Sequence, residues 1–269
     1  MSKKEQGEMS FLDHVEELRW HLVRAFIAIF SFAIVAFFSK KILFDQIILA
    51  PKDPDFITYR IFCNISRWLG LDEALCMTEV PFKLQNIDMA GQFTTHIWVS
   101  LIAGFILAFP YVIWELWRFI SPGLNSKERK YSSGIIFFTS LLFSAGVAFG
   151  YFVIAPLSVN FLGTYTISDQ VFNEINLGSF ISTVTTVTLA TGIVFELPIV
   201  VYFLTKIGLI TPQFMRKYRR HALVLTLILS AVITPPDVSS QVLVSIPILI
   251  LYELSIGISA WVIKRKDEQ

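Results

Sequence analysis

Six long apolar blocks constrain the fold of this 269-residue chain more than any other feature. A helix of about 20 apolar residues crosses a bilayer, and only helices and closed barrels satisfy their backbone groups there. The chain is 54% apolar and 16% charged, whereas soluble domains hold about 45–50% and about 25%. We therefore predict an all-α integral membrane protein with six transmembrane helices in a single polytopic membrane domain. The expected spans are 22–39, 93–117, 133–155, 180–204, 221–234 and 241–262.

The basic residues predict how these helices are oriented. With a cytoplasmic N-terminus, sixteen of the 22 Lys and Arg residues fall in cytoplasmic segments, and the other six lie between Lys40 and Lys83. Because Lys and Arg favour the cytoplasmic side, both termini are expected there. The first span follows about twenty mostly polar residues and is long enough to cross, so it is expected to remain as a signal anchor.

The longest connection is the first outer segment, at about 42–92. It holds both cysteines of the chain, Cys63 and Cys76. On an oxidising face they can form a disulfide, and two free thiols remain equally open.

Proline and length irregularities mark several spans. Pro110, Pro198 and Pro247 are expected to break the second, fourth and sixth helices, because proline removes a backbone donor. The fifth block of about 14 residues is only roughly 21 Å long as a helix. We therefore expect a short fifth helix, because the hydrocarbon core of a bilayer is about 30 Å thick.

Two carboxylates, Glu196 and Glu253, lie inside apolar blocks. An ionised carboxylate at mid-membrane costs at least about 2.5–3.5 kcal/mol, so such a residue is a candidate functional group. Gly192 and Thr185 share a helical face with Glu196, which favours helix contact or a wet groove over lipid. Glu253 is a second buried candidate nearer the cytoplasmic end. A hydrogen-bonded structural acid, a proton carrier and a docking site for another membrane protein all remain open.

Motifs of enzymes and cofactor sites are not evident. The four His residues are scattered and no Cys or His pair has metal-ligand spacing. No nucleophile–base or phosphate-binding pattern is present either. No metal, cofactor, nucleic-acid partner or enzymatic activity is expected.

Five motifs in order along the chain suggest a family. They are HVEELR (14–19), FISPGLNSKERK (119–130), YFVIAPL (151–157), FELP (195–198) and TPPDVSSQ (234–241). Together they resemble TatC, the multi-spanning receptor subunit of the Sec-independent twin-arginine protein translocase. The resemblance implies a concave, glove-like bundle in the bacterial inner membrane. It also implies binding of Arg-Arg signal peptides of folded cargo, recruitment of TatA- and TatB-type single-span subunits, self-association and drive by the protonmotive force.

The resemblance assigns the signal-peptide site by position. Glu17 and Glu128 match the acidic residues that bind the arginine pair, and Arg19, Phe119 and Pro122 match neighbouring positions. The assignment suits the chemistry, since a carboxylate accepts two hydrogen bonds from the planar guanidinium fork, which lysine lacks.

The resemblance also implies a partner-docking region. Glu196 matches the intramembrane glutamate of the family, and Thr234, Asp237 and Gln241 match the region near the short fifth helix. Glu253 is added as the second intramembrane carboxylate. Three prolines are expected to be structural, namely Pro51 of the first outer segment, Pro198 and Pro247.

Two features depart from the family pattern. The first outer segment, at roughly 52–88, is longer than usual, and Glu115 stands where a neutral polar residue is expected. Glu115 either adds a charge near the signal-peptide site or faces the inner interface. The alternative function is a proton-coupled secondary transporter of a small solute with Glu196 as proton carrier, although repeated halves, frequent in that class, are not evident.

Overall fold

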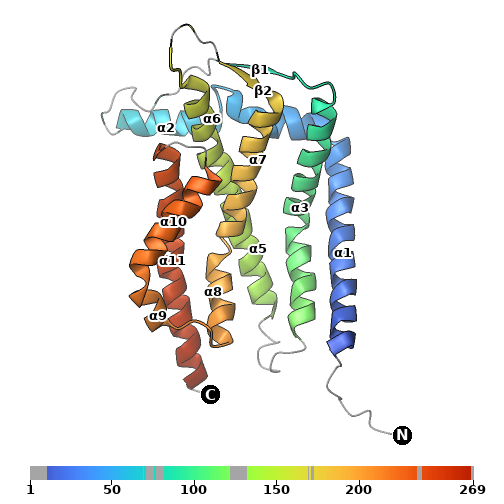
Figure 1. Ribbon diagram of the computed structural model, residues 1–269, viewed down its shortest axis with the longest axis vertical. Helices are drawn as coiled ribbons and strands as arrows, with labels where there is room; N and C mark the ends of the chain where they lie inside the picture. The colour runs from blue at the N-terminus through green and yellow to red at the C-terminus, as the bar shows by residue number, and fades with distance from the viewer. Residues whose placement is uncertain are drawn as a thin grey trace. The chain divides into compact units, whose positions relative to one another are not determined.

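The computed structural model describes residues 11–68, 70, 76, 82–121, 132–168, 170, 173–234 and 238–267, with backbone alone at 11–14, 132–133, 238–239 and 266–267. The chain divides into two compact units. The first unit comprises Met1–Phe38 and Ser100–Leu141, and the second comprises Ser39–Val99 and Leu142–Gln269. The described residues are mainly helical (Figure 1).

Five helical stretches among the described residues are long and apolar enough to cross a membrane, in accordance with the predicted all-α membrane fold. The first two lie in α1 (Phe11–Phe38) and α3 (Gly91–Ile120). The third joins α5 (Ser132–Phe149), the π-helix η4 (Gly150–Ile154) and α6 (Ala155–Thr164). The fourth joins α7 (Leu177–Val194) and α8 (Leu197–Lys206), and the last lies in α11 (Val238–Asp267).

The fifth apolar block forms α10 (Arg219–Ile233), which follows the short helix α9 (Pro212–Lys217). At 15 residues, α10 is shorter than the five long stretches. Its length is roughly 22 Å at about 1.5 Å per residue. The six-span count and the orientation of the termini stay predictions.

Of the three prolines expected to break helices, only Pro198 lies at an interruption. The fourth span is interrupted before Pro198, because α7 ends at Val194 and α8 begins at Leu197. Pro198 then occupies the first turn of α8, where a backbone N–H would have no helical partner. In contrast, α3 and α11 continue through Pro110 and Pro247, so the expected breaks there are wrong. Each of these helices loses one hydrogen bond, and the turns on either side keep it continuous.

Close helix packing in the first unit depends on small residues. A Cβ added to Gly104 of α3 would lie 2.6 Å from the backbone N of Ala33 and 2.7 Å from the carbonyl O of Ile29, both on α1. Ala33 and Ala108 are also buried. Gly104 and Ala108 are four residues apart, the small-xxx-small spacing that lets membrane helices approach closely.

The second unit uses the same device between its third and fourth spans. A Cβ on Gly146 would lie 2.7 Å from Cβ of Phe195, and one on Gly150 would lie 2.9 Å from Cα of Thr188. Beside this contact, a buried apolar cluster joins Ile154, Val187, Val244 and Ile248. The third, fourth and last spans are thereby packed around one core.

One end of the second unit carries additional short elements, and we call it the strand end. Here β1 (Lys83–Gln85) pairs in parallel with β2 (Glu174–Asn176), with Lys83 opposite Glu174. The π-helix η1 (Ile42–Ile48) and the 3₁₀ turn η2 (Ala50–Lys52) precede the helix α2 (Ile57–Trp68). In Figure 1, α2 lies across the direction of α6 and α7.

Two covalent or polar ties hold the segment after the first span. Cys63 of α2 is joined to Cys76 in a disulfide. The buried hydroxyl of Tyr59 donates hydrogen bonds to the carbonyl oxygens of Pro51, at 2.7 Å, and Pro156, at 3.1 Å. Burial raises the pKa of Tyr59 above its ordinary value, so the hydroxyl remains a donor at physiological pH. Pro51 is itself buried, which gives this proline a structural role.

Candidate functional site

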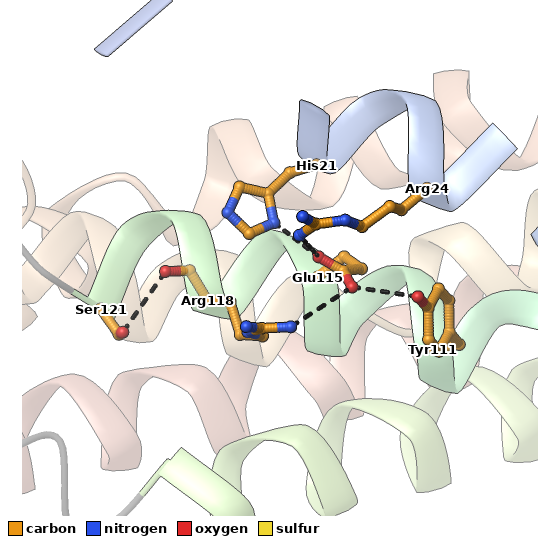
Figure 2. Close-up of polar contacts among 6 residues, drawn as sticks. All are labelled: His21, Arg24, Tyr111, Glu115, Arg118 and Ser121. Atoms are coloured by element: carbon orange, nitrogen blue, oxygen red, sulfur yellow. Dashed lines mark hydrogen bonds and ion pairs between the residues drawn. The ribbon is translucent and has the colours of Figure 1, made fainter. Parts of the chain in front are cut away.

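A buried carboxylate, Glu115, is the centre of a polar cluster between α1 and α3 of the first unit (Figure 2). Its side chain is 1% exposed. Oε2 of Glu115 lies 2.5 Å from Nδ1 of His21 and 3.7 Å from Nη1 of Arg24, both on α1. Oε1 accepts a 3.0 Å hydrogen bond from the hydroxyl of Tyr111 and lies 3.7 Å from Nη1 of Arg118. We call these five residues the Glu115 cluster.

The spacing of these residues explains how the cluster forms. Tyr111, Glu115 and Arg118 follow one another at four and three residues, which places them on one face of α3. His21 and Arg24 are three residues apart on α1 and share a face in the same way. Arg24 and Arg118 are 47% and 49% exposed. Their stems therefore bring charge to Glu115 while their guanidinium groups stay partly outside, which reduces the desolvation penalty of a buried ion pair.

The contacts of Glu115 bear on the two roles expected for it from the sequence. Both of its oxygens have partners, so it does not present an unpaired carboxylate to a peptide or to the inner interface. His21, Arg24, Tyr111 and Arg118 were not among the residues predicted from the sequence. The sequence contains one signal that could have indicated them. Opposite charges recur at helical spacing near the ends of the first and second apolar blocks.

Two predicted signal-peptide residues lie close to this cluster. The ring centroid of Phe119 is 6.2 Å from that of His21. Glu17 is half-buried and lies four residues before His21, hence on the same face of α1. Arg19 is exposed and lies two positions from Glu17, so it points to a different side of the helix. Glu128 and Pro122 lie outside the described residues.

The second buried carboxylate, Glu196, lies in the second unit and contrasts with Glu115. It occupies the turn between α7 and α8, as the residue that precedes α8. Both carboxylate oxygens are buried, and within the described part of the chain neither has a hydrogen-bond partner of normal geometry. The backbone of Phe143 approaches them. The hydroxyl of Thr188, on α7, is likewise buried and unpaired among the described residues. An unsatisfied buried polar group costs about 1–3 kcal/mol, which marks this turn as a place for a missing partner.

The predicted docking residues near α10 are engaged with that helix. The hydroxyl of Thr234 donates to the carbonyl of Ser230 at 2.8 Å, and Nε2 of Gln241 donates to the carbonyl of Leu227 at 3.1 Å. Both side chains thus bond to carbonyls in the last two turns of α10. Asp237 lies outside the described residues.

The expected burial of Glu253 is wrong. Its side chain is 52% exposed and forms a 2.6 Å ion pair with Arg219 at the start of α10. The sequence places Glu253 in an apolar block but does not show that a cation from another helix reaches it. Among the described residues, no group of three His, Cys, Asp or Glu side chains is placed to hold a metal ion.

Comparison with known proteins gives one consistent family. The family model described as "Sec-independent protein translocase protein (TatC)" matches residues 13–247. Sec-independent protein translocase protein TatC of Blattabacterium sp. subsp. Periplaneta americana is 42% identical over 98% of this chain and 100% of its own length. TatCy of Bacillus subtilis is 33% identical over 96% of this chain and 92% of its own. The crystal structure of the twin arginine translocase receptor TatC is 32% identical, with a TM-score of 0.70, over 93% of this chain and 99% of that one.

Proposed function

Because the chain belongs to the TatC family and is a multi-pass membrane component of the Sec-independent translocase, we propose that it is the subunit that binds Arg-Arg signal peptides. In this proposal the peptide of a folded cargo protein is bound at the cytoplasmic face. The chain then recruits single-span partner subunits, and the protonmotive force drives export. The family assignment favours this function over the secondary-transporter alternative.

One observation carries the proposal, namely the position of Glu17 beside the Glu115 cluster. Glu17 is half-buried, on the face of α1 that also bears His21, and the ring of Phe119 lies next to His21. A carboxylate that is partly shielded from water binds a guanidinium more strongly than a fully hydrated one. Glu128, from the same motif as Phe119, would supply the second carboxylate.

The Glu115 cluster adds a reason why these carboxylates stay available to a ligand. Arg24 and Arg118 are the two arginines of the cluster, and each lies 3.7 Å from a carboxylate oxygen of Glu115. The cluster therefore occupies two cations that could otherwise compete for Glu17. In this proposal Glu17 is not yet paired with a cation when the signal peptide arrives, and the arginine pair of the peptide becomes its partner.

Partner recruitment is proposed at the turn that contains Glu196. Its buried oxygens have no hydrogen-bond partner of normal geometry among the described residues, and a polar side chain of an inserted helix would satisfy them. We further propose that the short α10 locally thins the bilayer, since its roughly 22 Å falls short of the hydrocarbon core of about 30 Å. Lengthening α10 by a turn should then block transport.

The test is binding of a labelled Arg-Arg signal peptide to the purified full chain in nanodiscs. The variants are Glu17→Ala and Glu128→Ala, and Glu16→Ala is the matched control, because Glu16 is exposed and adjacent. We expect binding to fall at least about tenfold in both variants, equivalent to about 1.4 kcal/mol, and to be unchanged in the control.

A Lys-Lys peptide supplies the specificity control. It should bind the unmodified chain weakly, because an ammonium group cannot form the bidentate pair. Equal binding of both peptides, or a loss in Glu16→Ala as large as in Glu17→Ala, would contradict the assignment of the site.

A further inference from the structure

The helix α2 at the strand end has two different exposed faces. One is an apolar stripe whose members recur every three or four residues, as on one side of a helix. Its exposed fractions are 54% at Ile57, 48% at Ile61, 42% at Ile65 and 85% at Trp68. A soluble surface rarely shows a continuous apolar stripe without a function.

The second exposed face of α2 is polar and basic. It consists of Arg60, Asn64 and Arg67, which also follow at helical spacing and are exposed. The remaining side of α2 is buried against the protein through Thr58, Tyr59 and Ser66. A helix with one protein-facing side, one apolar side and one basic side has the pattern of an interfacial membrane helix.

The protein-facing side fixes where α2 lies along the third span. The hydroxyl of Thr58 donates to the carbonyl of Phe152, and that of Tyr59 donates to the carbonyl of Pro156. The charged stretch before this span ends just ahead of Gly134, where the candidate span begins. About 20 residues at about 1.5 Å cover the hydrocarbon core of about 30 Å, which brings the far boundary to about residue 154. Phe152 and Pro156 lie on either side of that position, so we expect α2 to lie at the membrane boundary.

Aromatic residues gather at the same level. The ring of Phe56 lies 5.8 Å from that of Tyr151 and 6.0 Å from that of Phe152. The hydroxyl of Tyr151 donates to the carbonyl of Ile47 in η1. Trp and Tyr are the residues enriched at membrane–water interfaces, and Tyr151 is such a residue here. The crosswise orientation of α2 relative to α6 and α7 in Figure 1 agrees with a helix that lies in the plane of the interface.

We propose that α2 is an interfacial helix whose apolar stripe inserts into the lipid leaflet at the strand end, with Arg60 and Arg67 at the level of the lipid phosphates. The occupant of the stripe is thus phospholipid. The proposal depends on the chain being a membrane protein and does not depend on signal-peptide binding or on which leaflet is cytoplasmic.

The test is site-specific photocrosslinking in the full chain. A diazirine amino acid is incorporated singly at position 61 or 65, on the stripe, and at position 64, on the polar face, as the matched control. The purified protein is placed in nanodiscs of phosphatidylcholine and phosphatidylglycerol, illuminated, and analysed by intact-protein mass spectrometry. A photoreactive amino acid is preferable to a cysteine label here, because an added thiol could exchange with the Cys63–Cys76 disulfide.

We expect lipid adducts at positions 61 and 65 to exceed those at position 64 several-fold. All three positions are exposed on the same helix, so replacement does not disturb buried packing. Adducts at 61 and 65 that are mainly to a second protein chain, or that are no more abundant than at 64, would overturn the proposal. The first result would point to a protein partner, and the second to a helix held above the membrane in water.

Discussion

Glu115 and Glu196 are both buried carboxylates in apolar helices, yet their surroundings are opposite. Glu115 contacts two arginines, a histidine and a tyrosine, all within the first unit. Glu196 of the second unit has no hydrogen-bond partner of normal geometry among the described residues. The helices around them also differ, because α3 is continuous at Glu115, whereas the fourth span is interrupted at Glu196.

This contrast gives a criterion that separates a structural carboxylate from a functional one in a membrane protein. A carboxylate whose hydrogen-bonding capacity is used stabilises the fold, and removing it leaves its hydrogen-bond donors and cations without their partner. A carboxylate without partners contributes little to the stability of the fold, so its presence has to be explained by a ligand or partner protein that binds to it. Three stability measurements would test this separation, and a fourth would test the helix packing in the unit that contains Glu115.

The largest effect is expected for Glu115→Leu. Breaking a buried ion pair by removing one member costs about 3–5 kcal/mol, and this change removes the common partner of His21, Arg24 and Arg118. We therefore expect a loss of that size in the free energy of unfolding. The measurement is unfolding by SDS in lipid–detergent bicelles, followed by circular dichroism. A loss below about 1 kcal/mol would mean that Glu115 is no more structural than an exposed ion pair.

A smaller loss is expected where α1 and α3 approach each other. Gly104→Ala places a methyl group within 2.6 Å of the backbone of Ala33. Overpacking of this kind costs about 1–3 kcal/mol. Gly134→Ala is the control, because a Cβ at Gly134 meets no atom of the described residues within 4 Å. Relieving a helical glycine there should raise stability by up to about 1 kcal/mol. If both substitutions changed the free energy of unfolding in the same direction, the close contact at Gly104 would not be the cause of the loss.

Tyr111→Phe should have a still smaller effect. It deletes only the 3.0 Å hydrogen bond to Glu115. Polar side-chain contacts within membranes contribute about 0.6 kcal/mol on average and about 1.7 at most. The same substitution in the Glu115→Leu background should cost almost nothing, since its partner is already gone. An undiminished cost in the double variant would show that Tyr111 acts through another neighbour.

Glu196→Leu is expected to change stability least. Removing a buried polar group that has no partner is nearly neutral or stabilising, so we expect a shift within about 1 kcal/mol and no loss beyond it. Export of a twin-arginine reporter in cells should nevertheless fail, because partner recruitment is proposed at this turn. A destabilisation as large as that of Glu115→Leu would make the two carboxylates equivalent and end the comparison.

The sequence predicts the helices better than it predicts the contacts between them. Apolar blocks show the membrane fold because each helix satisfies its own backbone, independently of its neighbours. The Glu115 cluster could not be predicted in the same way, because spacing shows that Tyr111 and Glu115 share a face of α3 but not that His21 faces them. Glu253 was misjudged for the same reason, since Arg219 reaches it from another helix.

The elements at the strand end escape prediction for a different reason. The helix α2 and the β1–β2 pair lie outside the apolar blocks, and each strand is only three residues long. Strands this short form because β1 and β2 are brought together by the segments around them rather than by their own composition. Conversely, α3 and α11 continue through Pro110 and Pro247. The one hydrogen bond that each proline removes is small in free energy compared with the many hydrogen bonds that remain in a helix of 30 residues.

The Cys63–Cys76 bridge has a consequence for the order of biosynthesis. It joins residues 13 apart within the single connection between α1 and α3. Closing it requires no contact with any later part of the chain. With the predicted orientation, in which this connection lies on the outer face, oxidation can therefore occur before α7 to α11 have been translated. The nascent chain would then carry a cross-linked α2 before most of its helices have entered the membrane.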